Sequence, residues 1–406
     1  MKKIISVLMF FNAVLFADWE IVNSPVNMSI FTVRFANSST GYIGSAAGMI
    51  YKTTNGGEGW SFQQLAGLGG YNINEIFINP INSNHVYAAG VDGSFHKTTN
   101  AGANWSFVDL GSNNLSTLIF FDLLHGLAAS YGTQMYITSN GGNNWTTVST
   151  GLPSENYYSS FLTGNAAYFS ASGGKIAKTT NAGLNWTIQN INESSAIFSL
   201  YFTDVNTGYA GTDNGKVYQT TNGGVNWFLL SVISPSFSIQ GFNSNGVDLY
   251  ICGNGGNIYK RPAGGNNWYQ QVSNYSSSFN DVCFLNEFTG FAVGSNGTIR
   301  KTTNGGNPIG IEVISNSIPG EFSLNQNYPN PFNPVTNIQF SVPHGSDVKL
   351  IVFDELGQQT AELVNQRLSA GSYKVDLDAS WFKSGVYFYR LSAGSFTETK
   401  KMILVK

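Results

Sequence analysis

The sequence predicts an all-β protein, a seven-bladed β-propeller followed by a small Ig-like β-sandwich, and three observations lead to this fold class. A turn motif, seen first as KTTNGGEGW at residues 52–60, returns about every 40 residues as far as residue 306. Each interval contains four short apolar or alternating runs separated by Asn-Gly or Asp-Gly turns, which indicates hairpins in series. Only 11% of the residues are charged and 46 are glycine, a composition typical of sheets joined by tight turns. Four antiparallel strands per period predict blades that stack around a ring.

The turn motif also counts the blades. It occurs seven times, and a tryptophan follows six of the copies. The last copy, at residues 301–306, has none, whereas Trp19 precedes Trp60 by one whole period. We therefore predict that the N-terminal strand supplies the outer strand of the seventh blade, which removes the free sheet edges. The motif asparagines are Asn55, Asn100, Asn140, Asn181, Asn222 and Asn304, and the tryptophans are Trp19, Trp60, Trp105, Trp145, Trp186, Trp227 and Trp268.

The residue types of the motif favour a structural lock over a repeated ligand site. The asparagine side chain can hydrogen-bond the backbone of its own turn, and the glycines accept the positive φ that such turns need. The tryptophan is expected to fold over the turn into the layer between blades. The segment resembles the Asp-box, with asparagine in place of aspartate in nearly every copy. In Asp-box propellers these turns lie opposite the active site, so the resemblance implies that function lies on the other face.

The two ends of the chain differ from the repeats. Residues 1–17 have two lysines, an apolar run too short to span a bilayer comfortably, and a small residue, the pattern of a cleavable signal peptide. The propeller is assigned to residues 18–308 and a linker to 309–320. Residues 321–406 contain alternating runs with regular turn signals, which predicts a small β-sandwich. No later run is long enough to predict a membrane span.

Five motifs of the tail occur in a fixed order: YPNPFNP at residues 328–334, VKLIVFDELG at 348–357, LSAGSY at 368–373, SGVY at 384–387 and TKKM at 399–402. With these motifs the tail resembles the type A C-terminal sorting domain of the type IX secretion system. The resemblance implies that the secretion machinery handles residues 321–406. It also implies a protein that is secreted or held on the outer cell surface, after removal of the tail. An Ig-like adhesion module is the alternative interpretation of this region.

The propeller half, with its Tyr-Lys-Thr-Thr-Asn-Gly-Gly-x-x-Trp run, resembles two groups of proteins. One is the photosystem II assembly and stability factor family, matched over residues 18–308. The other is the Asp-box glycosidase group, which includes sialidases and xyloglucanase-type enzymes. A shared fold does not carry a function, so the function has to be argued from the residues of the site.

Composition excludes several classes of site. The net charge of −3 provides no basic footprint for nucleic acid. The histidines and cysteines have no metal-ligand spacing, so neither a metal nor a cofactor is predicted. Cys252 and Cys283 lie in adjacent predicted blades. They could form a disulfide after export, or they could be two separate buried thiols, and the sequence favours neither alternative. A sialidase needs an arginine cluster, but Arg261 and Arg300 are interpreted as solvated edge residues.

Candidate binding residues lie at the starts of the inner strands and in the loops that lead to them. Arg34 lies in an inner-strand run, where it either reaches the wet channel or faces a ligand. A glycosidase needs two carboxylates about 5 to 10 Å apart, and scattered surface acids are the favoured interpretation of the acids here. Aromatic side chains among Asn, Ser and Gly are typical of binding surfaces, although core packing explains each one equally well. The candidates are Arg34, Tyr71, Glu75, Tyr157, Tyr158, Phe237, Tyr275 and Asp281.

These observations favour a secreted or cell-surface propeller that binds a protein or a glycan, and they assign no catalytic residue. Two alternatives stay open, a glycoside hydrolase of the Asp-box group and an assembly factor for a membrane protein complex. Two close carboxylates in a deep cleft at the channel mouth would favour the hydrolase. A shallow aromatic or polar face would favour binding.

Overall fold

The computed structural model describes residues 19–65, 71–152, 155–263, 265, 267–303, 305–306, 311–315, 317–379 and 382–406. The signal peptide predicted at residues 1–17 and the motif residue Asn304 lie outside this part of the chain. The described residues form strands and three short 3-10 helices, so the predicted all-β class is confirmed. Among them, no helix is long and apolar enough to cross a membrane.

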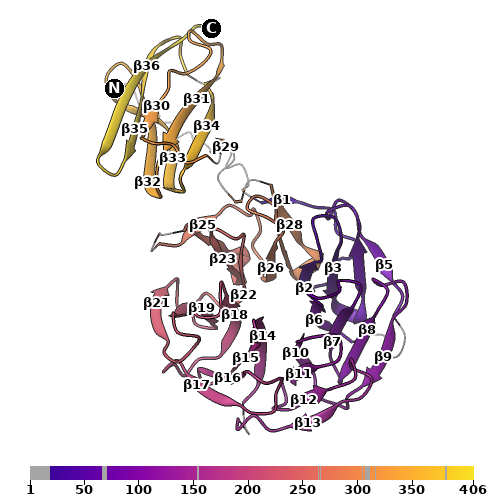
Figure 1. Cartoon of the computed structure of the whole chain (residues 1–406). Coiled ribbons are helices and arrows are strands. Elements are labelled where there is room, and N and C mark those ends of the chain that lie inside the picture. The colour runs from indigo at the N-terminus through magenta and orange to yellow at the C-terminus, as the bar shows by residue number, and fades with distance from the viewer. Residues whose placement is uncertain are drawn as a thin grey trace, which may run out of the picture.

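Seven four-stranded antiparallel sheets form a ring around a central channel (Figure 1), which confirms the predicted propeller. In blades 1 to 6 the strands follow in chain order from the channel outward. Blade 1 contains β2 (Ile30–Phe35), β3 (Gly41–Ser45), η1 (Ala46–Gly48), β4 (Ile50–Thr53) and β5 (Ser61–Gln63); blade 2 contains β6 (Ile73–Ile78), β7 (Val86–Gly90), β8 (Ser94–Thr98) and β9 (Ser106–Asp109); blade 3 contains β10 (Leu115–Phe120), β11 (Gly126–Ser130), β12 (Met135–Thr138) and β13 (Thr146–Val148).

The remaining blades repeat the same pattern. Blade 4 contains β14 (Tyr157–Thr163), β15 (Ala166–Ala171), β16 (Lys175–Thr179) and β17 (Thr187–Asn190); blade 5 contains β18 (Ile197–Phe202), β19 (Gly208–Thr212), β20 (Lys216–Thr220) and β21 (Phe228–Val232); blade 6 contains β22 (Ile239–Ser244), β23 (Leu249–Gly253), η2 (Asn254–Gly256), β24 (Ile258–Arg261) and β25 (Tyr269–Gln271); blade 7 contains β26 (Phe279–Phe284), β27 (Gly290–Gly294), η3 (Ser295–Gly297), β28 (Ile299–Thr302) and β1 (Glu20–Ile21).

Blade 7 combines strands from the two ends of the propeller. Its order is β1-β28-β27-β26, and β1 pairs antiparallel with β28, with Glu20 opposite Lys301. Just before β1, Trp19 is fully buried, and its backbone N–H donates to the carbonyl of Val272 at 3.2 Å. The last sheet therefore has no outer strand until the N-terminal segment joins it.

The turn motif is a small hydrogen-bonded lock. In blade 1, the hydroxyl of Thr53 donates to Asn55 Oδ1 at 2.9 Å and accepts the backbone N–H of Gly57 at 3.0 Å. Asn55 Oδ1 also accepts the backbone N–H of Gly59 at 3.0 Å. Gly57 has a φ of +84°, which L side chains rarely adopt. The same three bonds recur in blades 2 to 5, where the asparagines are Asn100, Asn140, Asn181 and Asn222.

The locks also join neighbouring blades. Lys52 of blade 1 donates to the carbonyl of Ala101 in the lock of blade 2 at 2.7 Å, and the Tyr42 hydroxyl donates to the same oxygen at 2.9 Å. Lysines of blades 2, 4 and 6 reach the next lock in the same way. Lys301 of blade 7 completes the circle through an ion pair with Glu58 of blade 1. The structure therefore gives these motifs a role in packing blade on blade.

Each tryptophan of the motif packs on an aromatic ring. In five blades it meets an inner-strand phenylalanine edge to face, and one of these pairs is Trp19 with Phe284, at 5.7 Å and 82°. The phenylalanine ring of blade 1, Phe35, lies over Gly41, where a Cβ atom would come within 2.6 Å of the ring. The other pairs are Phe35–Trp60, Phe120–Trp145, Phe202–Trp227 and Phe242–Trp268, with ring centroids 5.9 to 6.0 Å apart.

The tail consists of two four-stranded sheets that share one apolar core and lie outside the ring (Figure 1). One of its strands, β29 (Ile311–Ser315), lies inside the segment 309–320 predicted as a linker, and it pairs with β34 (Gly371–Asp378). Side chains on β31 alternate between buried and more exposed positions, as a sheet with one covered face requires. The hydroxyl of the buried Tyr389 donates to the carbonyl of Asn325 at 2.9 Å. One sheet contains β29 (Ile311–Ser315), β30 (Ser323–Leu324), β31 (Val335–Val342) and β34 (Gly371–Asp378), and the other contains β32 (Ser346–Phe353), β33 (Gln359–Leu368), β35 (Gly385–Ala393) and β36 (Phe396–Leu404).

Substitution of Trp19 tests the contribution of the N-terminal segment. Trp19→Ala should lower the free energy of unfolding by about 3–5 kcal/mol, because it removes a fully buried aromatic ring and leaves a cavity. Urea unfolding followed by circular dichroism measures the effect. In the same segment, Ile21 is 75% exposed, so Ile21→Ala should stay within about 0.5 kcal/mol of the parent chain. Equal stability of the two variants would show that Trp19 does not hold the seventh blade.

Candidate ligand-binding site in the central channel

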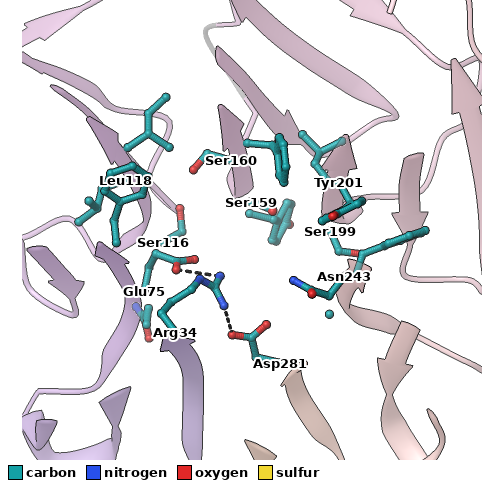
Figure 2. A pocket seen from close by; sticks show the side chains of 18 of the residues that line it. Arg34, Glu75, Ser116, Leu118, Ser159, Ser160, Ser199, Tyr201, Asn243 and Asp281 are labelled. Carbon is teal, nitrogen blue, oxygen red and sulfur yellow. Dashed lines mark hydrogen bonds and ion pairs between the residues drawn. The ribbon is translucent and has the colours of Figure 1, made fainter. Parts of the chain in front are cut away.

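Seven inner strands surround a cavity of about 630 Å³ in the channel (Figure 2). Each of these strands has a β-bulge between its first and third residues. A bulge re-aims the side chains next to it, and here the second residue of every inner strand lines the cavity. This ring of second residues consists of Phe31, Asn74, Ser116, Tyr158, Phe198, Gln240 and Asn280.

One side of the cavity carries a charged cluster from three adjacent blades. Arg34 of blade 1 forms an ion pair with Glu75 of blade 2 at 3.0 Å and another with Asp281 of blade 7 (Figure 2). Asp281 Oδ2 also accepts the backbone N–H of Val33 at 2.9 Å, which fixes this carboxylate against blade 1. The Arg34 side chain is 34% exposed to the channel, whereas those of Glu75 and Asp281 are 18% and 12% exposed.

The cluster changes how its members ionise. Burial raises the pKa of Glu75 from 4.5 to about 7, with Arg34 opposing the rise and Asp281 adding to it. Burial lowers the pKa of Arg34, but Asp281 and then Glu75 raise it further than burial lowers it. Arg34 therefore stays charged, and Glu75 changes its charge near neutral pH.

The opposite side of the cavity is aromatic and hydroxylic. Tyr158 lies 4.7 Å from Phe198 and 5.7 Å from Tyr131 between ring centroids, and Tyr131 is 40% exposed. Phe161 and Tyr201 also line the cavity, and their ring centroids are 5.1 Å apart. Serine side chains line the cavity as well, among them Ser116, Ser159, Ser160 and Ser199 (Figure 2).

The positions of Glu75 and Asp281 bear on the hydrolase alternative. Glu75 and Asp281 do meet in the channel, but the guanidinium of Arg34 bonds to both and occupies the space between them. A glycoside hydrolase places its scissile bond in that space. Within the described part of the chain, no group of three or more His, Cys, Asp or Glu side chains could hold a metal ion.

The eight predicted binding residues fall into two groups in the structure, four that line the cavity and four that do not. Arg34, Glu75, Tyr158 and Asp281 lie together in the cavity. The other four do not line it. They are Tyr157, which is fully buried with its hydroxyl bonded to Thr150; Phe237, which is 3% exposed and packs on Tyr259; Tyr275, whose hydroxyl donates to the carbonyl of Ser295 at 2.6 Å; and Tyr71, which is half-buried.

The structure corrects one interpretation of the arginines. Arg300 is not a solvated edge residue, since only 6% of it is exposed. Its Nε donates to the carbonyl of Ser273 at 3.0 Å, and its guanidinium lies 5.2 Å from the ring centroid of Tyr275. Packing of a neighbouring loop, which strand patterns do not reveal, buries this side chain. Cys252 and Cys283 are both buried free thiols.

Several cavity residues were not in the predicted set, and a shared position connects most of them. Asn74, Phe198 and Asn280 are second residues of inner strands, the position of the predicted Tyr158. An alignment of the starts of the seven inner strands places these residues at one shared position. The sequence does not reveal the bulges that turn this position toward the cavity. Tyr131 follows β11 in a loop, and no periodic signal marks it.

Comparison with protein families agrees with this architecture. Residues 326–406 match the secretion system C-terminal sorting domain, and residues 11–118 match the family of the photosynthesis system II assembly factor YCF48. Both resemblances predicted from the sequence are thereby confirmed. A chain with this sorting domain is exported by the type IX secretion system to the cell surface or beyond. No protein among those with curated functions matches the chain in sequence.

Solved structures show the same fold at low sequence identity. YCF48 bound to a D1 peptide is 19% identical, with a TM-score of 0.59, and the match covers 71% of this chain and 96% of that one. YCF48 from Cyanidioschyzon merolae is 17% identical, with a TM-score of 0.58 and coverages of 70% and 98%. PorZ, a surface component of the type IX secretion system of Porphyromonas gingivalis, is 13% identical, with a TM-score of 0.58 and coverages of 95% and 60%. These likenesses support the fold.

The titration of Glu75 tests the charged cluster. In the chain labelled with 13C-glutamate, the Glu75 carboxyl should titrate near pH 7. In Arg34→Gln its pKa should rise further, because Arg34 favours the ionised form. Since the pKa is raised on folding, the Glu75 contribution to stability is largest below about pH 4.5 and is lost as the pH rises through about 7.

Glu193 is the internal control for this titration. Its hydrogen bond with Lys216 holds its pKa at about 2, and it lies outside the cavity lining, so Arg34→Gln should leave it unchanged. A Glu75 pKa near 4.5, or a fall in that pKa in Arg34→Gln, would contradict the described cluster.

Proposed function

We propose that this chain is a secreted or cell-surface binding protein whose propeller holds a segment of a protein partner at the mouth of the central channel. The observation that carries the proposal is the cavity of about 630 Å³ with an aromatic wall facing a polar, charged one. Cavities of this size with aromatic sides and few fixed polar groups are typical ligand sites. The sorting tail delivers the propeller to the place where it acts.

The channel supports a protein ligand through the kind of contact it offers. Tyr131, Tyr158 and Phe198 present flat aromatic area at a small cost in conformational entropy, as binding surfaces do. The amide nitrogens of Asn74 and Asn280 donate to backbone carbonyls at 2.8 Å, which leaves their side-chain oxygens for a ligand. The propeller of YCF48, which shares this fold, was solved with a bound peptide.

A paired screen of peptides and glycans tests the binding function. The full-length chain should bind members of a random-peptide array, and Tyr158→Ala should weaken that binding about tenfold, because it removes the central ring of the aromatic wall. Phe62→Ala is the matched control, since Phe62 is 52% exposed on the outer strand of blade 1. Binding to a glycan array alone, or hydrolysis of a polysaccharide, would overturn the proposal.

Removal of residues 321–406 tests delivery. In a bacterium with a type IX secretion system, the shortened chain should accumulate inside the cell, because the segment that matches the sorting domain is gone. Immunoblots of cell fractions and medium measure the distribution. Tyr158→Ala should be exported like the parent chain. Normal export of the shortened chain would show that the tail does not direct it.

A further inference from the structure

The charges of the cavity are unequal in sign. Among the described residues that line the cavity, only Arg34, Glu75 and Asp281 are charged, so one cation stands against two carboxylates. The net charge is −1 when both acids are ionised. Arg34 contacts Glu75 Oε1 and Asp281 Oδ2, which leaves Glu75 Oε2 and Asp281 Oδ1. Asp281 Oδ1 accepts the backbone N–H of Val282 at 2.9 Å, and a carboxylate oxygen can accept a second hydrogen bond. Capacity to accept hydrogen bonds therefore remains on this side.

Neutral acceptors extend the charged cluster along the mouth of the channel. The Asn74 and Asn280 side chains precede Glu75 and Asp281 in the bulged segments of β6 and β26. Their amide nitrogens are used by the backbone of the next blade, at Leu115 and Ile30, so the oxygen is the free end of each amide. Two carboxylates and two amide oxygens together favour a ligand rich in hydrogen-bond donors.

The aromatic wall adds a second preference of the same kind. The face of a tyrosine or phenylalanine ring attracts a cation, and guanidinium groups also stack on such rings. Tyr131, Tyr158 and Phe198 form one continuous set of ring contacts at the mouth. Alkyl carbons of a long side chain can pack on the same rings.

We infer that the cavity takes a basic side chain, arginine or lysine, from the protein partner. The cation is held by the carboxylate oxygens that Arg34 does not contact, Glu75 Oε2 and Asp281 Oδ1, outside the space that Arg34 fills. The aliphatic stem lies against the rings of Tyr131, Tyr158 and Phe198. This inference rests on the proposed function, because it specifies which residue of the bound segment enters the channel.

Ionisation of Glu75 makes the interaction depend on pH. The titratable groups that face Glu75 are Arg34 on β2, Asp281 on β26 and Tyr131 after β11. Protonation of Glu75 near pH 7 brings the net charge of the cavity to zero. The attraction for a cation then falls as the pH drops from about 8 to about 6.

Peptides that differ at one fixed residue test the inference. Four dye-labelled nonapeptide pools, degenerate except for a central Arg, Lys, Gln or Glu, are titrated with the full-length chain and followed by fluorescence anisotropy. The Arg and Lys pools should bind about tenfold more tightly than the Gln pool, and the Glu pool more weakly still, because a charge-assisted hydrogen bond adds about that much. For the Arg pool, affinity should fall about tenfold between pH 8 and pH 6.

Glu75→Gln should remove the advantage of the Arg and Lys pools and the dependence on pH, while it changes the affinity of the Gln pool less than about twofold. Glu287→Gln is the control with the same loss of charge, since Glu287 is exposed in the turn between β26 and β27. The affinities of Glu287→Gln for the four peptide pools should follow the same order as those of the parent chain. Thermal unfolding confirms that both variants fold, and Asp281→Asn replaces Glu75→Gln if that variant does not.

The outcomes separate this inference from the function on which it rests. Equal binding of all four pools, or a preference for Glu, overturns the basic side chain and leaves a peptide-binding channel. No binding of any pool overturns the proposed function as well. Tighter binding of Arg and Lys that persists in Glu75→Gln places the cation elsewhere and also overturns the inference.

Discussion

The pairing of β1 with β28 is the constraint on which the channel depends, because it sets the distance between the first and last blades. Arg34 belongs to blade 1 and Asp281 to blade 7, so their ion pair lies across the seam where the ring closes. The residues that meet there are about 250 positions apart in the chain, and bringing them together costs loop-closure entropy. The buried ring of Trp19 and the strand pairing offset that cost. The contact between blades 1 and 7 therefore both closes the ring and forms part of the candidate site.

Much of the fold could be predicted because its signals are local. Turns of the Asn-Gly type, a period of about 40 residues and a tryptophan at a fixed offset reveal blades one at a time, without knowledge of their neighbours. The spacing from Trp19 to Trp60 pointed to the outer edge of the seventh blade, and β1 lies there. The hydrogen bonds of the locks follow from the side-chain chemistry of Thr and Asn alone.

The site was less accessible to sequence reasoning, because its geometry arises between blades. Arg34 could be suspected as a charge in an apolar run, but nothing in the sequence pairs it with Glu75 and Asp281. The bulges break the alternation of the inner strands, so a simple period of two misplaces the second residue of each. Tyr157 and Tyr158 illustrate the difference, since the first is fully buried and the second lines the channel. Arg300 illustrates burial by a distant loop.

The asparagine of each lock has a consequence for the chemistry of the whole ring. An aspartate could accept the same two hydrogen bonds as Asn55, but in blades 1 to 5 it would add five negative charges to one face of the ring. Such charges repel one another, and their repulsion varies with ionic strength. An amide does not titrate. The geometry of the locks is therefore the same at low and at high ionic strength. The carboxylates of the channel can also change charge without weakening the turns that hold the blades together.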